Sequence, residues 1–491
     1  MMRTGGADLT IAGGIREFGR ATPAAIAVRD ADRMLTFGAL DDRSSRLANA
    51  LLAEGLRPGD RVALLSGNRL EYPEIAAGIA KAGLVLVPIN PRLAAPEIDF
   101  ILGHSGARVL ITDGPHGEGP EKTKTIGDAY EKWIAAAEPK DPWIAVDERD
   151  PFCIAYTAGT TGDPKGVLIS HRSRCLTFYA TALEWGLGPG RRTIAVAPMY
   201  HGAGFAFAYA AVYCGATVSM LRAFDPHALL DMIQREQAQS VFLVPTHAQL
   251  IRGAVHKIPV LPSLDTLYFN AAALPKVLKE WVFEAFPGAG VHELYGSTEA
   301  GVVTNLRPPD ARRKAGSVGH PWFATQVRIV GPDGQPVPPG MPGELYSRSP
   351  YLMNGYHENP AATAACTTGD GFLTSGDIVV ADEEGFISIV DRVKDVIITG
   401  GVNVYPRDVE EVLLTHAGIV EAAVVGEPDE RWGERVVAYV VCRSPLETAA
   451  LDGHLRARLA GYKVPKEFKV VAALPRNAAG KVLKRELRST P

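Results

Sequence analysis

Hydrophobic positions in the first part of the chain alternate between two spacings, and this alternation predicts an α/β fold. Over 38–54, Leu40, Leu47 and Leu51 recur at helical spacing, and the pattern stops at Gly55. Short continuous apolar runs follow, as expected of buried parallel strands. The pattern predicts helices over 74–82 and 96–102 and strands over 61–65, 84–89 and 107–112. Repeated strand–helix units of this kind build a mostly parallel sheet.

The same alternation returns after residue 152 and predicts a second α/β lobe. Its predicted helices cover 227–236 and 276–286, and its strands cover 240–244, 266–269 and 291–294. The stretch 113–149 between the two lobes is polar and carries prolines, so we expect a surface excursion there.

The sequence pattern changes from Gly316 onward. Residues 331–343 hold five prolines and four glycines, and short strands with turns predict a small antiparallel, β-barrel-like portion. About 100 residues follow Asp391, with predicted helices over 406–414 and 449–459 and strands over 420–425 and 436–442. That size suits a separate α+β domain. We therefore expect a large domain over 1–391 and a small one over 392–491.

Residues 202–221 contain no Asp, Glu, Lys or Arg, which matches the crude length of a membrane helix. Three glycines interrupt the segment, and its pattern changes after Cys214. These features favour a buried helix, a turn and a buried strand. We expect no membrane span.

Composition narrows the function classes. Lys plus Arg number 51 against 55 for Asp plus Glu, and the net charge of −4 offers no basic excess for nucleic acid. The five cysteines are scattered, which favours a reducing compartment over a disulfide framework or a zinc site. Residues 1–20 lack the apolar core of a signal peptide. We expect a cytoplasmic protein, with a homodimer as an open alternative.

Candidate chemistry is concentrated in 157–166, which reads Thr-Ala-Gly-Thr-Thr-Gly-Asp-Pro-Lys-Gly between two apolar runs, so we expect a loop that joins two strands. Glycines let the backbone approach an anion, threonines add hydroxyl donors, and Lys165 supplies a mobile positive charge. Pro164 before Lys165 and Gly166 after it exclude a Walker A motif. An ordinary glycine-rich hairpin turn is the alternative for this segment taken alone.

Residues 156–166 resemble the phosphate-binding signature of the adenylate-forming enzymes, which include acyl- and aryl-CoA ligases (acyl-CoA synthetases), luciferases and peptide-synthetase adenylation domains. Four further segments fall in that family's order: Tyr-Gly-Ser-Thr-Glu at 295–299, Thr-Ser-Gly-Asp at 374–377, Asp-Arg-Val-Lys-Asp at 391–395 and Pro-Arg-Asn-Ala-Ala-Gly-Lys at 475–481. The resemblance implies an AMP-binding adenylation domain over 1–391 and a mobile lid domain over 392–491. It also implies ATP, Mg²⁺ and CoA as cofactors and co-substrate.

The resemblance assigns nucleotide contacts residue by residue. The outer phosphates would contact Thr157, Gly159, Thr160, Thr161, Gly162 and Lys165. Thr298 would hold the α-phosphate and Glu299 a Mg²⁺ ion, which prefers few carboxylates and many phosphate or water oxygens. The adenosine would contact Asn270, Ala271, Ala272, Tyr295, Gly296 and Asp377, and Arg392 would add a donor to the ribose or the α-phosphate. Asn270 departs from the family's usual Gly, and Ser375 from its usual Thr.

The resemblance also implies two conformations for two half-reactions. Lys394 would be the hinge, and Lys481 would bring its charge to the incoming carboxylate and the α-phosphate. After rotation, Gly400 and Gly401 would leave room for the CoA tunnel.

The acid pocket is implied to include His201, Phe205, Thr246 and Ser297. His201 would gate the pocket or steer the carboxylate, with a structural histidine as the alternative. No Lys or Arg falls in the segments assigned to this pocket, so an apolar monocarboxylic acid is favoured, whether fatty, aromatic or alicyclic.

We therefore expect an ATP-dependent acid–CoA ligase that forms an acyl-adenylate and then an acyl-CoA. One rival is a stand-alone adenylation enzyme that loads a carrier protein. A second is a catalytically inactive binding protein, which would have lost Lys481, Glu299 or Asp377. All three are present.

Overall fold

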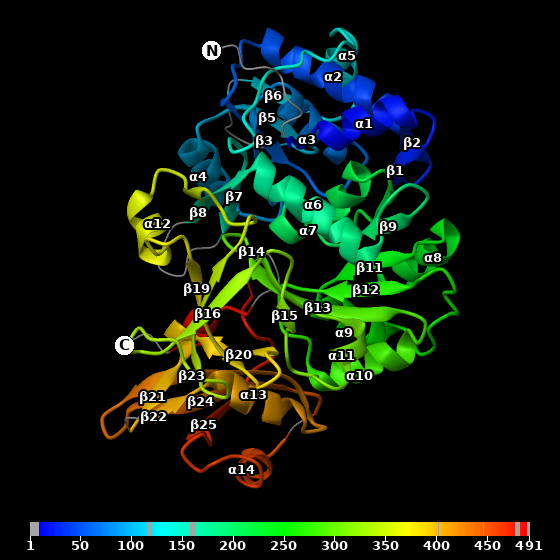
Figure 1. Ribbon diagram of the computed structural model, residues 1–491. Coiled ribbons are helices and arrows are strands. Elements are labelled where there is room, and N and C mark those ends of the chain that lie inside the picture. The colour runs from blue at the N-terminus through cyan, green and yellow to red at the C-terminus, as the bar shows by residue number, and fades with distance from the viewer. Residues whose placement is uncertain are drawn as a thin grey trace.

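The computed structural model describes residues 9–115, 120, 122–157, 164–400, 402–444, 446–476 and 482–488. Two mixed sheets with helices around them form the large N-terminal part, and a small α+β unit lies at the other end of the molecule (Figure 1). The expected α/β class with a smaller C-terminal unit is confirmed.

The first sheet has seven strands in the order β18-β8-β7-β4-β3-β5-β6. Its strands are β3 (Arg61–Leu65), β4 (Val85–Ile89), β5 (Ala107–Thr112), β6 (Lys122–Thr125), β7 (Pro151–Thr157), β8 (Lys165–Ser170) and β18 (Gly355–Tyr356). The four neighbour pairs from β7 to β6 are parallel, whereas β7, β8 and β18 are antiparallel. The apolar runs before and after the candidate phosphate loop are therefore the two strands of a hairpin, as predicted.

The second sheet has nine strands in the order β15-β14-β13-β12-β11-β9-β10-β1-β2. Its strands are β1 (Ile26–Asp30), β2 (Arg33–Thr36), β9 (Arg192–Ala195), β10 (Thr217–Met220), β11 (Ser240–Leu243), β12 (Thr266–Phe269), β13 (Gly290–Ser297), β14 (Gly301–Leu306) and β15 (His320–Pro321). The predicted second lobe corresponds to this sheet, which also recruits β1 and β2 from the start of the chain.

Helices fill the space between and outside the sheets. In the N-terminal part they are α1 (Gly13–Ala21), α2 (Phe37–Ala53), α3 (Glu71–Lys81), α4 (Ala95–Ser105), α5 (Asp128–Ala135), α6 (His171–Trp185), α7 (Gly202–Tyr213), α8 (Pro226–Glu236), α9 (Pro245–Ala254), α10 (Lys276–Ala285), α11 (Pro308–Ala311) and α12 (Pro360–Cys366). Figure 1 shows α6 and α7 in the middle of the molecule. Phe178 of α6 and Phe205 and Tyr209 of α7 belong to one core that includes side chains of both sheets.

Local sequence fixes where α6 begins and ends. The Ser170 hydroxyl accepts a 3.1 Å hydrogen bond from the Ser173 amide, which caps the first turn. Gly186 follows the last turn with a φ of +64°, a left-handed conformation that favours glycine. The first turn of α6 is thereby held against the strand β8 that leaves the phosphate loop.

The segment 202–221 is α7, a turn and β10, as predicted, and its apolar side chains are buried in the core. None of the helices within the described ranges is long and apolar enough to cross a bilayer.

The stretch 113–149 differs from its prediction as a surface excursion. β6 extends the first sheet in parallel with β5, and α5 packs on α2 with Tyr130 and Ile134 buried. The sequence did not predict β6 because its residues are polar and show no strand pattern. An edge strand can nevertheless form, since only its backbone groups need to pair.

The β-rich portion after Gly316 is an open sheet, and the expectation of a barrel-like form is corrected. The sheet has the order β16-β17-β19-β20, made of β16 (Gln326–Val330), β17 (Gly343–Arg348), β19 (Leu373–Ala381) and β20 (Ile387–Arg392). Among the described residues, β16 and β20 are not paired with each other. A barrel would need that closure.

The small C-terminal unit has its own core, which includes Ile397, Val409 and Val424. Its elements are η1 (Val393–Asp395), β21 (Ile397–Thr399), β22 (Val402–Val404), α13 (Pro406–Leu414), β23 (Ile419–Asp429), β24 (Gly433–Cys442), α14 (Thr448–Arg456), β25 (Glu467–Val470) and α15 (Lys484–Leu487). The long β23–β24 hairpin carries α13 on one face.

Candidate active site

The candidate phosphate loop joins two strands at a closed hairpin. Thr157 at the end of β7 pairs with Lys165 at the start of β8, and Tyr156 pairs with Gly166. A Cβ at Gly166 would lie 2.8 Å from Ile154, so this position requires glycine. The predicted contacts Gly159, Thr160, Thr161 and Gly162 lie outside the described residues.

Lys165 faces a group that the sequence did not predict. Its Nζ lies 5.1 Å from the ring centroid of Tyr356 on β18, close enough for a cation–π contact. The Tyr356 hydroxyl donates a 3.1 Å hydrogen bond to Oε1 of Glu299. Tyr356 therefore connects the loop lysine with the proposed metal ligand, because β18 pairs with β8.

Thr298 and Glu299 lie in the tight turn between β13 and β14. A Cβ at Gly296 would lie 2.0 Å from the Gly301 carbonyl oxygen, so only glycine fits there. The Ser297 hydroxyl accepts a 3.0 Å bond from the Ala300 amide, and the Glu299 carbonyl accepts a 2.8 Å bond from Met353. The turn is therefore held rigidly, and the side chains of Thr298 and Glu299 are half-buried.

A second cluster is centred on Asp377, which is buried. Tyr295 on β13 donates from its hydroxyl to Oδ2 over 2.5 Å, and Nε of Arg392 on β20 lies 3.1 Å from Oδ1. Burial and the nearby carboxylate raise the pKa of Tyr295 well above its ordinary value, so its hydroxyl stays a donor. Three predicted residues from distant segments therefore meet here.

The adenine-side segment 270–272 follows β12 in an exposed turn. Ala271 has a φ of +76°, and its amide donates a 2.5 Å bond to the side-chain oxygen of Asn270. The Asn270 side chain thus stabilises the left-handed conformation of Ala271. The glycine that the family usually has at position 270 lacks a side chain and could not do so. Within the described part of the chain, no hydrogen bond joins Ala272 to the Asp377 cluster.

His201 precedes the first turn of α7. Burial, with a smaller contribution from Arg92, lowers the pKa of His201 to about 4, so the ring is neutral at pH 7. His201 and Phe205 line one small cavity of about 10 Å³ that reaches β4, β7 and β8.

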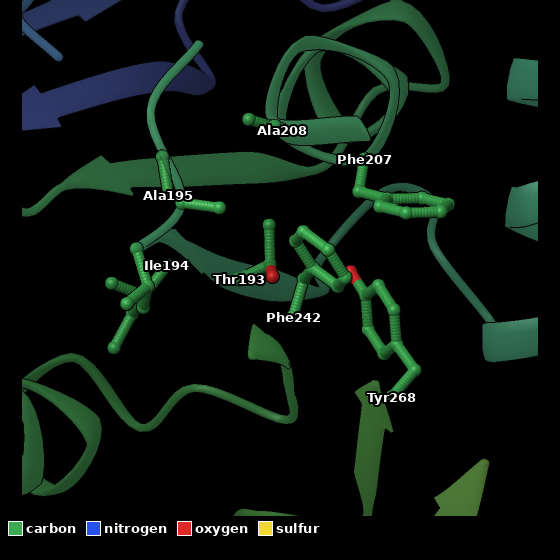
Figure 2. A pocket seen from close by; sticks show the side chains of 10 residues that line it. Thr193, Ile194, Ala195, Phe207, Ala208, Phe242 and Tyr268 are labelled. Carbon is green, nitrogen blue, oxygen red and sulfur yellow. The ribbon is translucent and has the colours of Figure 1, made fainter. Parts of the chain in front are cut away.

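A second small cavity lies on the other side of α7, among β9, β11 and β12. Figure 2 shows the side chains of Phe207, Phe242 and Tyr268 around it. The Phe207 and Phe242 ring centroids are 4.7 Å apart, which makes an aromatic wall. The predicted pocket residues Thr246 and Ser297 line neither cavity.

Arg174 was missed by the sequence analysis because it comes from the first turn of α6. Its side chain lines the cavity of His201, and its Nη1 makes one long contact of 3.5 Å with the Gly202 carbonyl. Its Nε is buried and lacks a hydrogen-bond partner in the described part of the chain. The segments assigned to the acid pocket contain no Lys or Arg, but Arg174 reaches the cavity of His201 from α6, outside those segments.

The predicted hinge residue Lys394 is the middle residue of η1, directly after β20. Arg488 donates from Nη2 to the Lys394 carbonyl over 3.3 Å and lies 3.4 Å from the Asp395 carboxylate. Lys484 of the same C-terminal segment pairs with Glu410 at 2.8 Å. The segment that follows Lys481 is thus attached to the hinge, whereas Lys481 itself lies outside the described residues.

Gly400 has a φ of +56°, and a Cβ there would lie 3.1 Å from the Trp432 ring. The glycine therefore suits both its backbone conformation and the space. Gly401 lies outside the described residues.

The side chains fit a Mg²⁺ ion bound mainly through substrate oxygens. Within the described ranges, no three His, Cys, Asp or Glu side chains form a group that could hold a metal ion. Glu299 offers one carboxylate, and Mg²⁺ in nucleotide sites takes one or two carboxylates together with phosphates and water.

Comparison with known proteins identifies the family. A family model described as AMP-binding enzyme matches residues 15–357, and one described as AMP-binding enzyme C-terminal domain matches 408–481. Feruloyl-CoA synthase of Amycolatopsis sp. is 39% identical over 96% of both chains. The fatty acid–[acyl-carrier-protein] ligase ScoC of Streptomyces coeruleorubidus is 36% identical over 95% of this chain and 93% of its own.

A solved structure supports the same family. The o-succinylbenzoate CoA synthetase of Bacillus subtilis, in complex with its acyl-adenylate intermediate, superposes with a TM-score of 0.89 at 30% identity, over 97% of this chain and 98% of its own. The same synthetase has been solved with ATP and a magnesium ion. This chain belongs to the AMP-binding enzymes, the adenylate-forming superfamily, and is an AMP-forming CoA ligase.

Proposed function

We propose that this ligase activates a monocarboxylic acid with an apolar body, fatty, aromatic or alicyclic, as an acyl-adenylate and transfers the acyl group to CoA. The observation that supports the proposal is the Lys165–Tyr356–Glu299 contact: Lys165, the proposed phosphate-binding cation, lies over the Tyr356 ring, and Glu299, the proposed metal ligand, accepts from its hydroxyl. The apolar preference rests on the aromatic wall formed by Phe207 of α7, Phe242 of β11 and Tyr268 of β12.

In this proposal each cluster has one task. Thr157, Lys165 and the loop between them hold the outer phosphates, and Thr298 holds the α-phosphate. Asp377, fixed by Tyr295 and Arg392, accepts hydrogen bonds from the ribose hydroxyls. A bound Mg²⁺ would neutralise phosphate charge next to Glu299. His201 is a neutral ring at the entrance to the acid site.

The remaining roles belong to the C-terminal unit. We place the domain boundary at 391/392, because the C-terminal core includes Ile397 while Ile387 belongs to the large core. Lys481 would bring its charge to the α-phosphate in the first half-reaction. Rotation about Lys394 would then replace it with Gly400 and Gly401, which leave room for the CoA thiol.

Release of AMP tests the acid class. Purified enzyme, ATP and Mg²⁺ are incubated with ferulate, benzoate, octanoate, palmitate or cyclohexanecarboxylate, with and without CoA. We expect CoA-dependent AMP release with at least one of these acids and little with malonate. Strong activity with malonate alone would contradict the apolar preference.

A carrier-protein ligase is the second candidate, because ScoC acts on an acyl-carrier protein and is 36% identical. The same assay separates the two. A phosphopantetheinylated carrier protein that replaces CoA, with acyl transfer many-fold faster than to CoA, would favour the second candidate.

A further inference from the structure

Arg174 is a cation whose charge no described side chain neutralises. No Asp or Glu in the described part of the chain lies within ion-pair distance of its guanidinium, and its buried Nε lacks an acceptor. Its neighbour Arg172, by contrast, pairs with Glu148 at 2.5 Å. A guanidinium keeps its charge in proteins and offers five N–H donors. An unpaired one beside a cavity is therefore suited to an anion.

The groups around the Arg174 guanidinium are neutral or positive. Burial raises the pKa of the Cys153 thiol to about 12, so it is uncharged, and His201 is neutral at pH 7. Arg92 adds positive charge near His201 and Tyr200. The remaining lining of the cavity is mainly apolar. An anion that enters from the active-site side thus meets attraction without a competing carboxylate.

Gly202 locates the place where such an anion would lie. A Cβ at Gly202 would be 4.0 Å from Nη2 of Arg174 and 3.7 Å from Oγ1 of Thr298. The two groups therefore border the same small space, which the missing side chain leaves open. Thr298 is the residue to which the proposed function assigns the α-phosphate.

We propose that Arg174 binds the carboxylate of the acid substrate and holds it beside Thr298 for attack on the α-phosphate of ATP. The inference rests on the proposed function, in which Thr298 holds that phosphate. A carboxylate oxygen forms the new bond to the α-phosphorus as the bond to pyrophosphate breaks, and no proton is exchanged. The negative charge of the carboxylate leaves on pyrophosphate.

Two consequences distinguish this role from a structural one. The acyl group of the adenylate is uncharged, so Arg174 contributes to binding the free acid and much less to binding the adenylate. Arg174 also belongs to the N-terminal part of the chain, so its contact with the acid does not depend on the position of the C-terminal unit. Removal of Arg174 should therefore impair the first half-reaction alone.

The test compares Arg174→Met, Arg174→Lys and the control Arg172→Met with the wild type. Acid-dependent ATP–pyrophosphate exchange gives KM for ferulate, octanoate and the dicarboxylate 2-succinylbenzoate. Calorimetry with α,β-methylene-ATP gives the Kd of ferulate and octanoate and of their primary amides. CoA-dependent turnover of chemically made acyl-adenylate reports the second half-reaction.

We expect Arg174→Met to raise KM for the reacting acid at least 10-fold, with KM for ATP and turnover of supplied adenylate within about 2-fold of the wild type, since a charge-assisted contact typically contributes that much. The preference for carboxylate over amide should disappear in Arg174→Met and return in part in Arg174→Lys. Arg172→Met should retain the wild-type values.

Three results would overturn the inference while leaving the proposed function intact: an unchanged KM for the acid, an equal loss of both half-reactions, or a loss confined to 2-succinylbenzoate, which would place a second carboxylate at Arg174. If Arg174→Met does not fold, the Arg174→Lys variant and the wild-type ratio of carboxylate to amide affinity decide in the same way. Absence of exchange by the wild type with every acid would overturn the proposed function itself.

Discussion

The Tyr295 hydroxyl and the Asp377 carboxylate are joined by a 2.5 Å hydrogen bond, although 82 positions separate them in the chain. Arg392 approaches the other carboxylate oxygen at 3.1 Å, so both oxygens of Asp377 are oriented before any ligand binds. A carboxylate fixed in this way accepts a ribose diol without first losing rotational freedom. The contact joins the β13 strand of the second sheet to the open sheet that precedes the hinge.

Tyr295→Phe should raise KM for ATP by about 5- to 30-fold, since a lost hydrogen bond to a buried charged group typically costs about 1–2 kcal/mol. KM for the acid should change little. ATP–pyrophosphate exchange measures both. The control is Tyr130→Phe, which removes a buried 2.6 Å tyrosine–carboxylate bond to Glu74, far along the chain from the site. Equal ATP kinetics in Tyr295→Phe and the wild type would remove Asp377 from ribose binding.

Tyr356→Phe should increase the Mg²⁺ concentration needed for half-maximal activity about 3- to 10-fold, because Glu299 loses the 3.1 Å donor that orients it. Tyr356→Leu should in addition raise KM for ATP, since Lys165 loses the ring beneath its ammonium group. Glu299→Gln should need still more Mg²⁺. Activity is titrated against free Mg²⁺, and binding of Mg²⁺–ATP is followed by calorimetry.

Tyr346→Phe is the matched control for Tyr356, because it removes a similar 3.3 Å bond to Glu344 in the open sheet. Its Mg²⁺ titration should coincide with that of the wild type. A Tyr356→Phe titration that also coincides would show that Tyr356 does not orient Glu299.

Lys481→Ala and Lys394→Pro should fail in opposite half-reactions. Loss of the Lys481 charge should slow adenylate formation by on the order of 10²-fold and spare thioester formation from supplied adenylate. Proline at 394 restricts φ at the pivot and should leave adenylation largely intact while slowing thioester formation. Pyrophosphate release and single-turnover acyl-CoA formation measure the two steps, with exposed Lys140→Ala as control.

The outcome that contradicts the alternating-domain proposal is loss of the same half-reaction in both variants. The Arg488 contact with the Lys394 carbonyl offers a further check, since Arg488→Ala should alter the second half-reaction more than the first.

Folding stability should fall as the pH is lowered from about 6.5 toward 4, because four histidines are buried in the neutral form. Burial lowers the pKa of His171 to about 3 and those of His201, His247 and His292 to about 4. The unfolded chain binds protons at these histidines near pH 6.5, whereas the folded chain does not. The folding free energy is therefore unaffected by these histidines above pH 6.5 and becomes less favourable below it. At pH 5 each depressed histidine costs about 2 kcal/mol.

His171→Gln tests this sign. The difference in unfolding free energy between pH 7.5 and pH 5.0, measured with guanidinium chloride, should shrink by about 2 kcal/mol relative to the wild type. Exposed His227→Gln is the control and should leave the difference unchanged. A His171→Gln variant with the full wild-type pH dependence would show that His171 is not the buried neutral group.

Local patterns were enough to predict most elements and the order of the motifs. The strands Arg61–Leu65, Ala107–Thr112 and Thr266–Phe269 and the helix Pro406–Leu414 have the predicted bounds. Hydrophobic spacing reports which face of a segment is buried, and that property depends on near neighbours alone. The β7–β8 hairpin around the candidate phosphate loop was predicted for the same reason, since its apolar strands and its glycines are adjacent in the chain.

The pairing of distant segments was decided by the tertiary structure. β18 has only two residues, Gly355 and Tyr356, and no periodicity marks it. Its pairing with β8 is what brings Tyr356 to Lys165 and Glu299. The polar strand β6 was missed and the open β16–β20 sheet was expected to close, because backbone hydrogen bonds between strands carry no side-chain signature.

The sequence by itself determined which residue types are available for adenylate chemistry: the phosphate loop, Thr298 and Glu299, Asp377 and Lys481. It could not determine which charges remain unpaired, since ion pairs form between side chains that folding brings together. Arg172 and Arg174 are alike in sequence, yet one pairs with Glu148 and the other faces His201 and Gly202 without a carboxylate. Side chains two positions apart in a helix point to different faces. The packing of α6 against β7 and α7 therefore gives the two arginines different surroundings.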